Sequence, residues 1–188
     1  HVMSPDGHGH HVDLVVDASQ VTHNTGVAIA GAAAVAAAVS GGISGASVTE
    51  AATLGIKAAE LGQRRGDWAP GPSVARRIAW SIELIDADDH ERSVRDVVEL
   101  IGTSLAAQES VPAAFAILAL HPDDPWQACL TAASLGGDSD TIAAMTGAIA
   151  GACHGMDRWP RDAVQTLREV NNLDLETIAE KLLALRAS

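Results

Sequence analysis

Apolar residues recur every three or four positions along most of the chain, which is the spacing that one face of an α-helix produces. In the segment 73–86, for example, Val74, Ile78 and Ile82 fall on one helical face. No convincing stretch shows the strict apolar and polar alternation of a half-buried strand. The pattern predicts a helix in each of ten segments: 12–22, 26–39, 48–64, 73–86, 93–102, 111–120, 125–135, 142–155, 160–171 and 175–186.

Proline, glycine and aspartate cluster between these segments, at 66–72, 87–90, 121–125 and 155–160, where we expect loops. The chain contains no recognisable interdomain linker and no internal repeat. A length of 188 residues is enough for one domain with its own core. The sequence therefore predicts a single all-α domain over residues 1–188.

The segment between Asn24 and Thr49 carries no charged residue, and positions 26–39 are almost entirely Ala, Val, Ile and Gly. Its length would suit a membrane span. Alanine and glycine contribute much less hydrophobicity than Leu, Ile or Phe, and the pair Gly41-Gly42 interrupts the run. We therefore expect a central helix buried in a helical domain, with small residues that let its neighbours approach closely, and no membrane partner.

The composition limits the classes of partner. The 12 basic and 24 acidic residues give a net charge of −12, which disfavours binding to nucleic-acid backbones and to anionic membranes. The two cysteines, Cys129 and Cys153, lie in apolar helical patterns without a Cys-x-x-Cys pairing, so we expect buried free thiols. No secretory signal is visible, and the expected location is the cytoplasm.

A run of glycines and oxygen-bearing side chains, Gly136-Gly137-Asp138-Ser139-Asp140-Thr141, precedes a small-residue helix. Two carboxylates and a hydroxyl on a glycine-loosened turn suit a hard cation such as magnesium, which prefers oxygen ligands. The alternative is helix capping, because Asp, Ser and Thr are good N-caps and acids in the first turn suit the helix dipole. Spacing alone leaves both interpretations open.

Several separated motifs resemble the carboxy-terminal half of the ADP-ribosylglycohydrolase family. They are the segments 21–24, 109–114, 134–143 and 147–152, in the order in which that family has them. The resemblance implies an all-helical hydrolase that cleaves the glycosidic bond at C1″ of ADP-ribose with two magnesium ions in a cleft. It assigns Asp138, Asp140 and Thr141 as metal ligands. Ser139 stands where a threonine is common in the family.

The same resemblance implies substrate contacts. His23 is expected to contact the ADP-ribose ligand, with Asn24 beside it, and Leu105 is expected near the ribose at the reacting end. Glu109 receives no role. We interpret Ser110 as the cap of a helix that opens at Pro112, since serine suits a cap and proline suits a first turn.

Nothing before His23 resembles the family's amino-terminal glycine-rich loop or its acidic metal motif, where relatives carry the catalytic carboxylate. We therefore expect hydrolysis of ADP-ribosylated side chains or O-linked ADP-ribose esters to need an amino-terminal segment of the same protein or a second chain. The general acid or base and the acceptor residue stay unassigned. The alternative is a non-catalytic helical fragment that binds ADP-ribose or packs against a partner chain.

Overall fold

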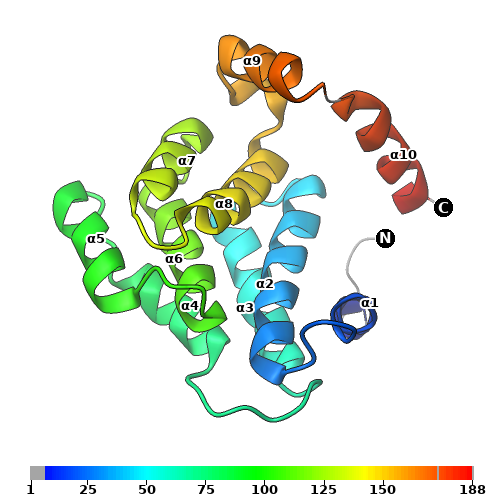
Figure 1. Ribbon diagram of the computed structural model, residues 1–188, viewed down its shortest axis with the longest axis vertical. Helices are drawn as coiled ribbons and strands as arrows, with labels where there is room; N and C mark the ends of the chain where they lie inside the picture. The colour runs from blue at the N-terminus through cyan, green and yellow to red at the C-terminus, as the bar shows by residue number, and fades with distance from the viewer. Residues whose placement is uncertain (1–6, 173, 188) are drawn as a thin grey trace.

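The computed structural model describes residues 7–172 and 174–187 and confirms the all-α prediction. Within these residues there is no strand, and only an isolated bridge joins Thr25 to Asp67. A short π-helix, η1 (Val97–Ile101), and a 3-10 turn, η2 (Met156–Arg158), accompany the α-helices (Figure 1). The α-helices of the described chain are α1 (Gly7–Ser19), α2 (Gly26–Ile43), α3 (Val48–Gly62), α4 (Val74–Glu83), α5 (His90–Asp96), α6 (Ala107–Leu120), α7 (Pro125–Ser134), α8 (Ser139–His154), α9 (Arg161–Asn171) and α10 (Leu175–Ala187).

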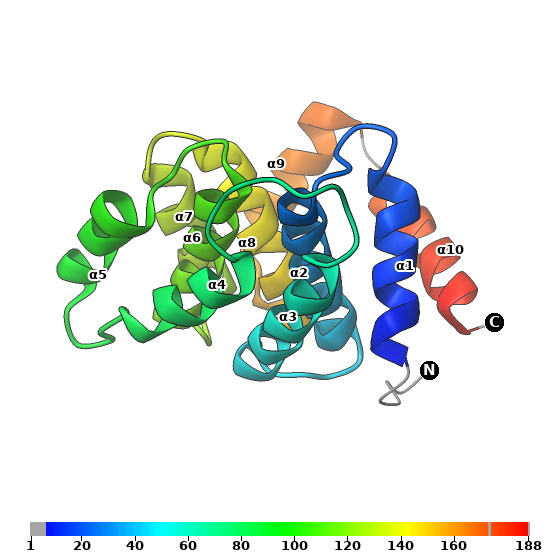
Figure 2. The ribbon, with the colours of Figure 1, turned by 90° about the horizontal axis from the view of Figure 1, so that it is seen from below.

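Helix α2 lies at the centre of the fold and packs against α1, α3, α6 and α8 (Figures 1 and 2). It passes through Gly41 and Gly42, which the sequence pattern placed beyond its end. By length and composition it could cross a membrane, but 61% of its residues are buried inside the fold. A side chain at Gly42 would meet the backbone of Ala152 and Cys153, so α2 and α8 approach closely here.

Two clusters of buried side chains form most of the core. The first joins α2, α3, α4, α6 and α8 around Phe115 and Ile78. The second joins η1, α6, α7 and α8 around Ile117 and Ile142. Helix α6 contributes buried residues to both clusters, so its position fixes how the two halves of the fold meet.

Helix α6 begins at Ala107, four residues before the predicted start, and the prediction that Ser110 caps it was wrong. Ser110 lies in the first turns, is buried, and donates its hydroxyl to the carbonyl of Ala106 at 3.3 Å. Pro112 lies inside the helix and lacks the N–H that would reach the carbonyl of Gln108. The Nε of Arg77 donates to that carbonyl at 2.5 Å, which supplies the missing hydrogen bond.

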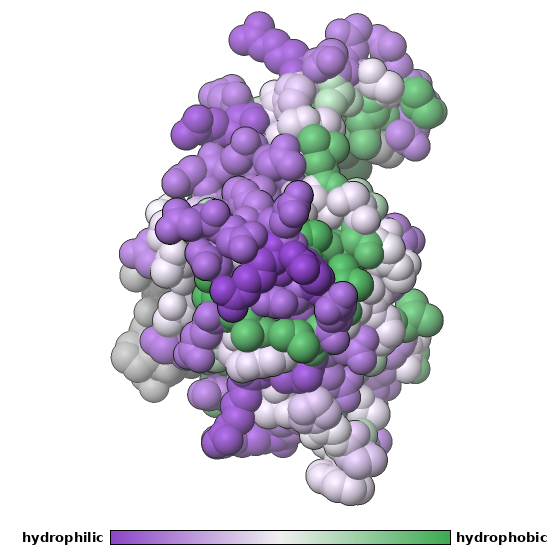
Figure 3. All heavy atoms as spheres, turned by 90° about the vertical axis from the view of Figure 1, so that its left-hand side faces the viewer, coloured by the Kyte–Doolittle hydropathy of each residue, from purple (hydrophilic) through white to green (hydrophobic). Residues whose placement is uncertain are grey.

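Helices α9 and α10 extend beyond the main bundle (Figure 1). Arg186 attaches α10 to the end of α2. Its guanidinium donates to the hydroxyls of Ser40 and Ser44 and to the carbonyl of Ser40. Leu182 and Leu185 of α10 are exposed. On the opposite side of the molecule, hydrophilic residues dominate the surface over α5, with hydrophobic residues beside them (Figure 3).

Both cysteines are free thiols, as the sequence predicted, but each is only partly buried. Burial raises the pKa of the Cys129 thiol and of the Cys153 thiol. A raised pKa keeps both groups protonated near neutral pH, where a thiolate would be needed for nucleophilic attack.

Candidate metal and substrate site

The predicted metal motif forms a tight turn at the start of α8. Gly137 has φ +65°, and a side chain there would collide with the carbonyl oxygen of Thr103. The N–H of the next residue, Asp138, donates to the same carbonyl at 2.7 Å. Glycine is therefore needed for both the backbone angle and the close approach. The contact joins the start of α8 to the loop between η1 and α6.

Asp138 occupies the N-cap position of α8, yet its side chain makes no capping hydrogen bond within the described structure. Other aspartates that directly precede a helix do cap it. Asp89 accepts from the N–H of Arg92 at 3.0 Å, and Asp124 accepts from the N–H of Gln127 at 3.0 Å. The half-buried carboxylate of Asp138 is thus left available for another ligand.

Asp140 and Thr141 lie exposed in the first turn of α8. The two aspartates and the threonine place three oxygen-bearing side chains within four residues at the positive end of a helix dipole. No salt bridge of the described residues involves either aspartate. This donor set fits a hard cation such as magnesium as a partial shell. Over the described chain, no three His, Cys, Asp or Glu side chains converge as a metal cluster.

His23 lies in the loop between α1 and α2 and lines a groove of about 580 Å³. Its side chain is exposed, and its Nδ1 lies 3.0 Å from the hydroxyl of Thr22. The small residues of α2 form the floor, and α6 and α8 contribute the far wall. The groove is lined by Ala18, Ser19, Thr22, His23, Ala28, Gly31, Ala32, Val35, Ala36, Ala107, Val111 and Met145.

One residue of the metal motif, Thr141, lies on the face of α8 that lines the groove. Met145, which lines the groove, lies four residues after Thr141, and side chains at this spacing stack on one side of a helix. Asp140 lies five residues before Met145 and therefore on another side of the helix. Ala107 and Val111 of α6 line the same groove, and α6 follows the loop that contacts Asp138. The structure therefore brings the His23 loop, α6 and the Thr141 face of α8 to one surface.

The two remaining predicted substrate residues lie outside that lining. Asn24 donates from its side-chain amide to a carboxylate oxygen of Asp67 at 3.3 Å, and its carbonyl accepts from the N–H of Asp67 at 2.7 Å. These contacts attach the 63–73 loop to the start of α2, across which it runs (Figure 2). Leu105 is 85% exposed, two residues before Ala107. Their substrate contacts stay predictions.

Sequence reasoning assigned no part to Thr103, whose carbonyl holds the amide of Asp138. It also left Glu109 without a role. The carboxylate of Glu109 accepts from the N–H of Ser104 at 3.1 Å, one residue after Thr103. The glycine at position 102 was the available signal, because its φ of +91° marks a turn that a side chain would strain.

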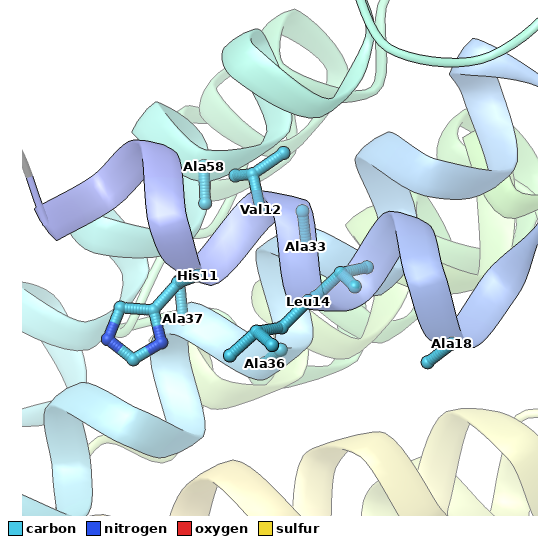
Figure 4. Close-up of a pocket in the computed structure, with 9 residues that line it drawn as sticks. His11, Val12, Leu14, Ala18, Ala33, Ala36, Ala37 and Ala58 are labelled. Carbon is cyan, nitrogen blue, oxygen red and sulfur yellow. The ribbon is translucent and has the colours of Figure 1, made fainter.

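A second cavity, between α1 and the α2–α3 pair, is a poor site for a charged ligand (Figure 4). It measures about 230 Å³, and its lining is almost entirely alanine, valine and leucine, with His11 at one end. Val12 of α1 packs there against Ala33, Ala37 and Ala58. The cavity follows from alanine-rich packing and contains no carboxylate among its lining residues.

Comparison with known proteins gives consistent results. Residues 3–188 match the family ADP-ribosylglycohydrolase. The chain is 33% identical to Uncharacterized protein YegU of Escherichia coli over 176 residues, which are 93% of the chain and 53% of YegU. It is 38% identical over 103 residues to ADP-ribosylhydrolase ARH3 of Mus musculus, covering 50% of the chain and 27% of that protein.

The human ARH3 matches with the same identity over 103 residues, which are 28% of its length. The chain thus spans about half the length of YegU and just over a quarter of the two ARH3 proteins. The family match extends over nearly the whole chain and includes both the α8 motif and the groove. On this basis the chain belongs to the ADP-ribosylglycohydrolase family.

Proposed function

We propose that this chain forms part of a magnesium-dependent hydrolase that cleaves the C1″ glycosidic bond of ADP-ribosylated substrates. The observation that carries the proposal is the carboxylate of Asp138, which makes no capping hydrogen bond at the start of α8 and is followed closely by Asp140 and Thr141. Family membership and the names of the ARH3 relatives support this reaction class.

Asp138, Asp140 and Thr141 would hold magnesium through their side-chain oxygens. Bound magnesium supplies charge stabilisation and orients oxygen ligands in hydrolysis. The chain contributes acidic oxygens at a fixed turn, so their positions are set by Gly137 and by the hydrogen bond from the Asp138 amide to Thr103. A preformed turn lowers the cost of arranging the ligands before binding.

His23 would contact the ADP-ribose part of the substrate from the opposite wall of the groove. The support is its exposed imidazole on a groove that also contains Met145 of α8. The groove is lined mostly by small apolar residues, which leaves room for a flat ring or a sugar. Asn24 and Leu105 are proposed as neighbours of the ligand.

The rest of the metal shell and the catalytic carboxylate are proposed to come from an amino-terminal segment of the same protein or from a second chain. The support is the partial shell, because the described residues bring no third acidic side chain to Asp138 and Asp140. The same observation favours one other function, a helical module that binds ADP-ribose without cleaving it.

A complementation experiment separates these functions. The chain is expressed alone and together with the part of YegU that it does not match, and release of ADP-ribose from an ADP-ribosylated peptide is measured with magnesium and with a chelator. We expect release only when both parts and magnesium are present. Binding of ADP-ribose without release in every combination would favour the non-catalytic module. Full magnesium-dependent activity of the chain alone, as a monomer in sedimentation, would show that the two-part account is wrong.

A further inference from the structure

We propose that Glu109 is a positioning residue for Asp138, acting through the turn at 102–104. The inference rests on the proposed function for its importance, because Asp138 is the central metal ligand of that proposal. It concerns a residue that the sequence motifs single out and that the proposed reaction leaves unused.

The first contact is between Glu109 and the turn. The Oε2 atom of Glu109 accepts from the N–H of Ser104 at 3.1 Å. A side chain at Gly102 would collide with the same carboxylate, so Glu109 packs directly on the backbone of the turn. The φ of +91° at Gly102 turns the chain back toward α6. One carboxylate thus contacts the turn at both ends.

The second contact is between the turn and the metal motif. Thr103 lies between Gly102 and Ser104, and its carbonyl accepts the N–H of Asp138 at 2.7 Å. The backbone of Thr103 is also the surface against which Gly137 packs. Because Glu109 fixes the residues on both sides of Thr103, it fixes the direction of the carbonyl that holds Asp138.

The third contact makes the base of the turn rigid. Arg77 donates from Nη2 to the carbonyl of Ile101 at 2.5 Å and from Nε to the carbonyl of Gln108 at 2.5 Å. These carbonyls lie immediately before the turn and immediately before Glu109. Arg77 therefore holds the two ends of the loop while Glu109 sets its tip, and a change at Glu109 reaches Asp138 without a change in the core.

Amide hydrogen exchange tests the proposal directly, without relying on activity. In the 188-residue chain, Glu109→Ala should speed exchange of the Asp138 amide by about tenfold, since its acceptor is no longer held in place. Glu109→Gln keeps an acceptor oxygen and should restore most of the protection. The Ile142 amide, which donates to the Asp138 carbonyl at 3.1 Å, should stay protected in both variants and reports on any loss of the helix itself.

The matched control is Glu50→Ala. Glu50 also accepts a backbone N–H, that of Ser47 at 2.8 Å, but at the start of α3. This variant should leave Asp138 exchange unchanged. Gly102→Ala should accelerate Asp138 exchange as Glu109→Ala does, and combining the two should add little, because both act on one contact.

Magnesium chloride titration of the chain assembled with its complementing segment, followed by the amide shifts of residues 138–141, completes the experiment. Magnesium affinity should fall about tenfold in Glu109→Ala, the effect typical of losing an outer-shell contact. Faster Asp138 exchange in Glu109→Ala, together with no magnesium binding by the wild-type assembly, would refute the metal site and still support the positioning role. Unchanged Asp138 exchange in Glu109→Ala would overturn the positioning role, whatever the metal titration gives.

Discussion

The starts of α7 and α8 carry the same residue type at the same position and use it differently. Asp124 before α7 bonds the N–H of Gln127, and Pro125 follows it at the first helical position. Asp138 before α8 makes no such bond, although its backbone is held by Thr103. The backbone angles of the two residues also differ, since ψ is 87° at Asp124 and 45° at Asp138.

The comparison indicates what the aspartate at each start is for. At α7 the carboxylate satisfies an N–H that the helix leaves without a partner, so its role is local stability. At α8 the turn is fixed by backbone contacts, and the carboxylate contributes nothing to capping. An acidic group kept half-buried without a capping role is a candidate ligand, whereas Asp140 lies in the first turn, where an acid suits the helix dipole.

The largest expected effect comes from removing the aspartate carboxylate at one of these helix starts and comparing it with the same removal at the other. In the chain assembled with its complementing segment, Asp138→Ala should weaken magnesium binding by at least about 100-fold, because losing an outer-shell partner alone costs 10–100-fold. Asp124→Ala should leave magnesium binding intact and lower the free energy of unfolding by about 1 kcal/mol. Calorimetric titration and thermal unfolding measure the two quantities. Equal magnesium affinity in both variants would contradict the assignment of Asp138 as a metal ligand and Asp124 as a helix cap.

A smaller effect is expected at the opposite wall of the groove. His23→Ala should weaken ADP-ribose binding by about tenfold, the loss that one hydrogen bond to a charged group typically causes. Magnesium affinity should change little, since His23 belongs to the α1–α2 loop and not to the α8 start. Separate titrations with ADP-ribose and magnesium distinguish the two. Unchanged ADP-ribose affinity would return His23 to a structural role beside Thr22.

A serine that caps a helix and a serine inside a helix extend the comparison to stability alone. Ser73 caps α4 by accepting from the N–H of Arg76, so Ser73→Ala should lower the free energy of unfolding by about 1 kcal/mol. Ser110 lies inside α6 and donates to a carbonyl that backbone N–H groups already use, so Ser110→Ala should cost less than about 0.5 kcal/mol. Chemical denaturation of the two variants gives the comparison. A larger loss for Ser110→Ala would restore its importance at that start.

The smallest effect is a pH dependence at the start of α3, where the cap is complete. The Glu50 carboxylate accepts hydrogen bonds from Ser47, and these lower its pKa below the ordinary value of 4.5. The bond from the Ser47 backbone N–H has the larger effect and the bond from the Ser47 hydroxyl the smaller. A lowered folded-state pKa stabilises the protein above the unfolded value, and this stabilisation disappears as the pH falls through the folded value. The melting temperatures of wild type and Glu50→Gln should therefore differ most near neutral pH and converge below pH 4.5. A constant difference across this range would contradict the assignment.

Much of the fold was predictable from the sequence because helical periodicity, caps and loops agree along the chain. The predicted starts at 48 and 125 match α3 and α7, and the buried central helix was correct. The start of α6 was missed because Pro112 was interpreted as a first-turn residue. Arg77, which lies 31 residues before Gln108 in the sequence, donates to the Gln108 carbonyl and so makes proline acceptable inside the helix. A contact between residues so far apart in the sequence cannot be predicted from the pattern of neighbouring residues.

The candidate site divides in the same way. The α8 motif was visible because its glycines and acids are contiguous, and His23 was found through resemblance. Thr103 could not be assigned, because it acts through its carbonyl and any residue type has one. Glu109 was visible as a charged residue, but its contact with Ser104 depends on how η1 and α6 are joined in space.

The proline inside α6 has a consequence for how the family's sequences should vary. Because Pro112 has no N–H, the Gln108 carbonyl is free to accept from Arg77. The residue types at positions 77 and 112 therefore depend on each other. In a relative where another residue replaces the proline, its N–H returns to the helix and the arginine loses one of its two partners. Positions 77 and 112 should therefore change together across an alignment, and an arginine retained without the proline would mark a lineage in which the loop that begins after Ile101 alone requires it.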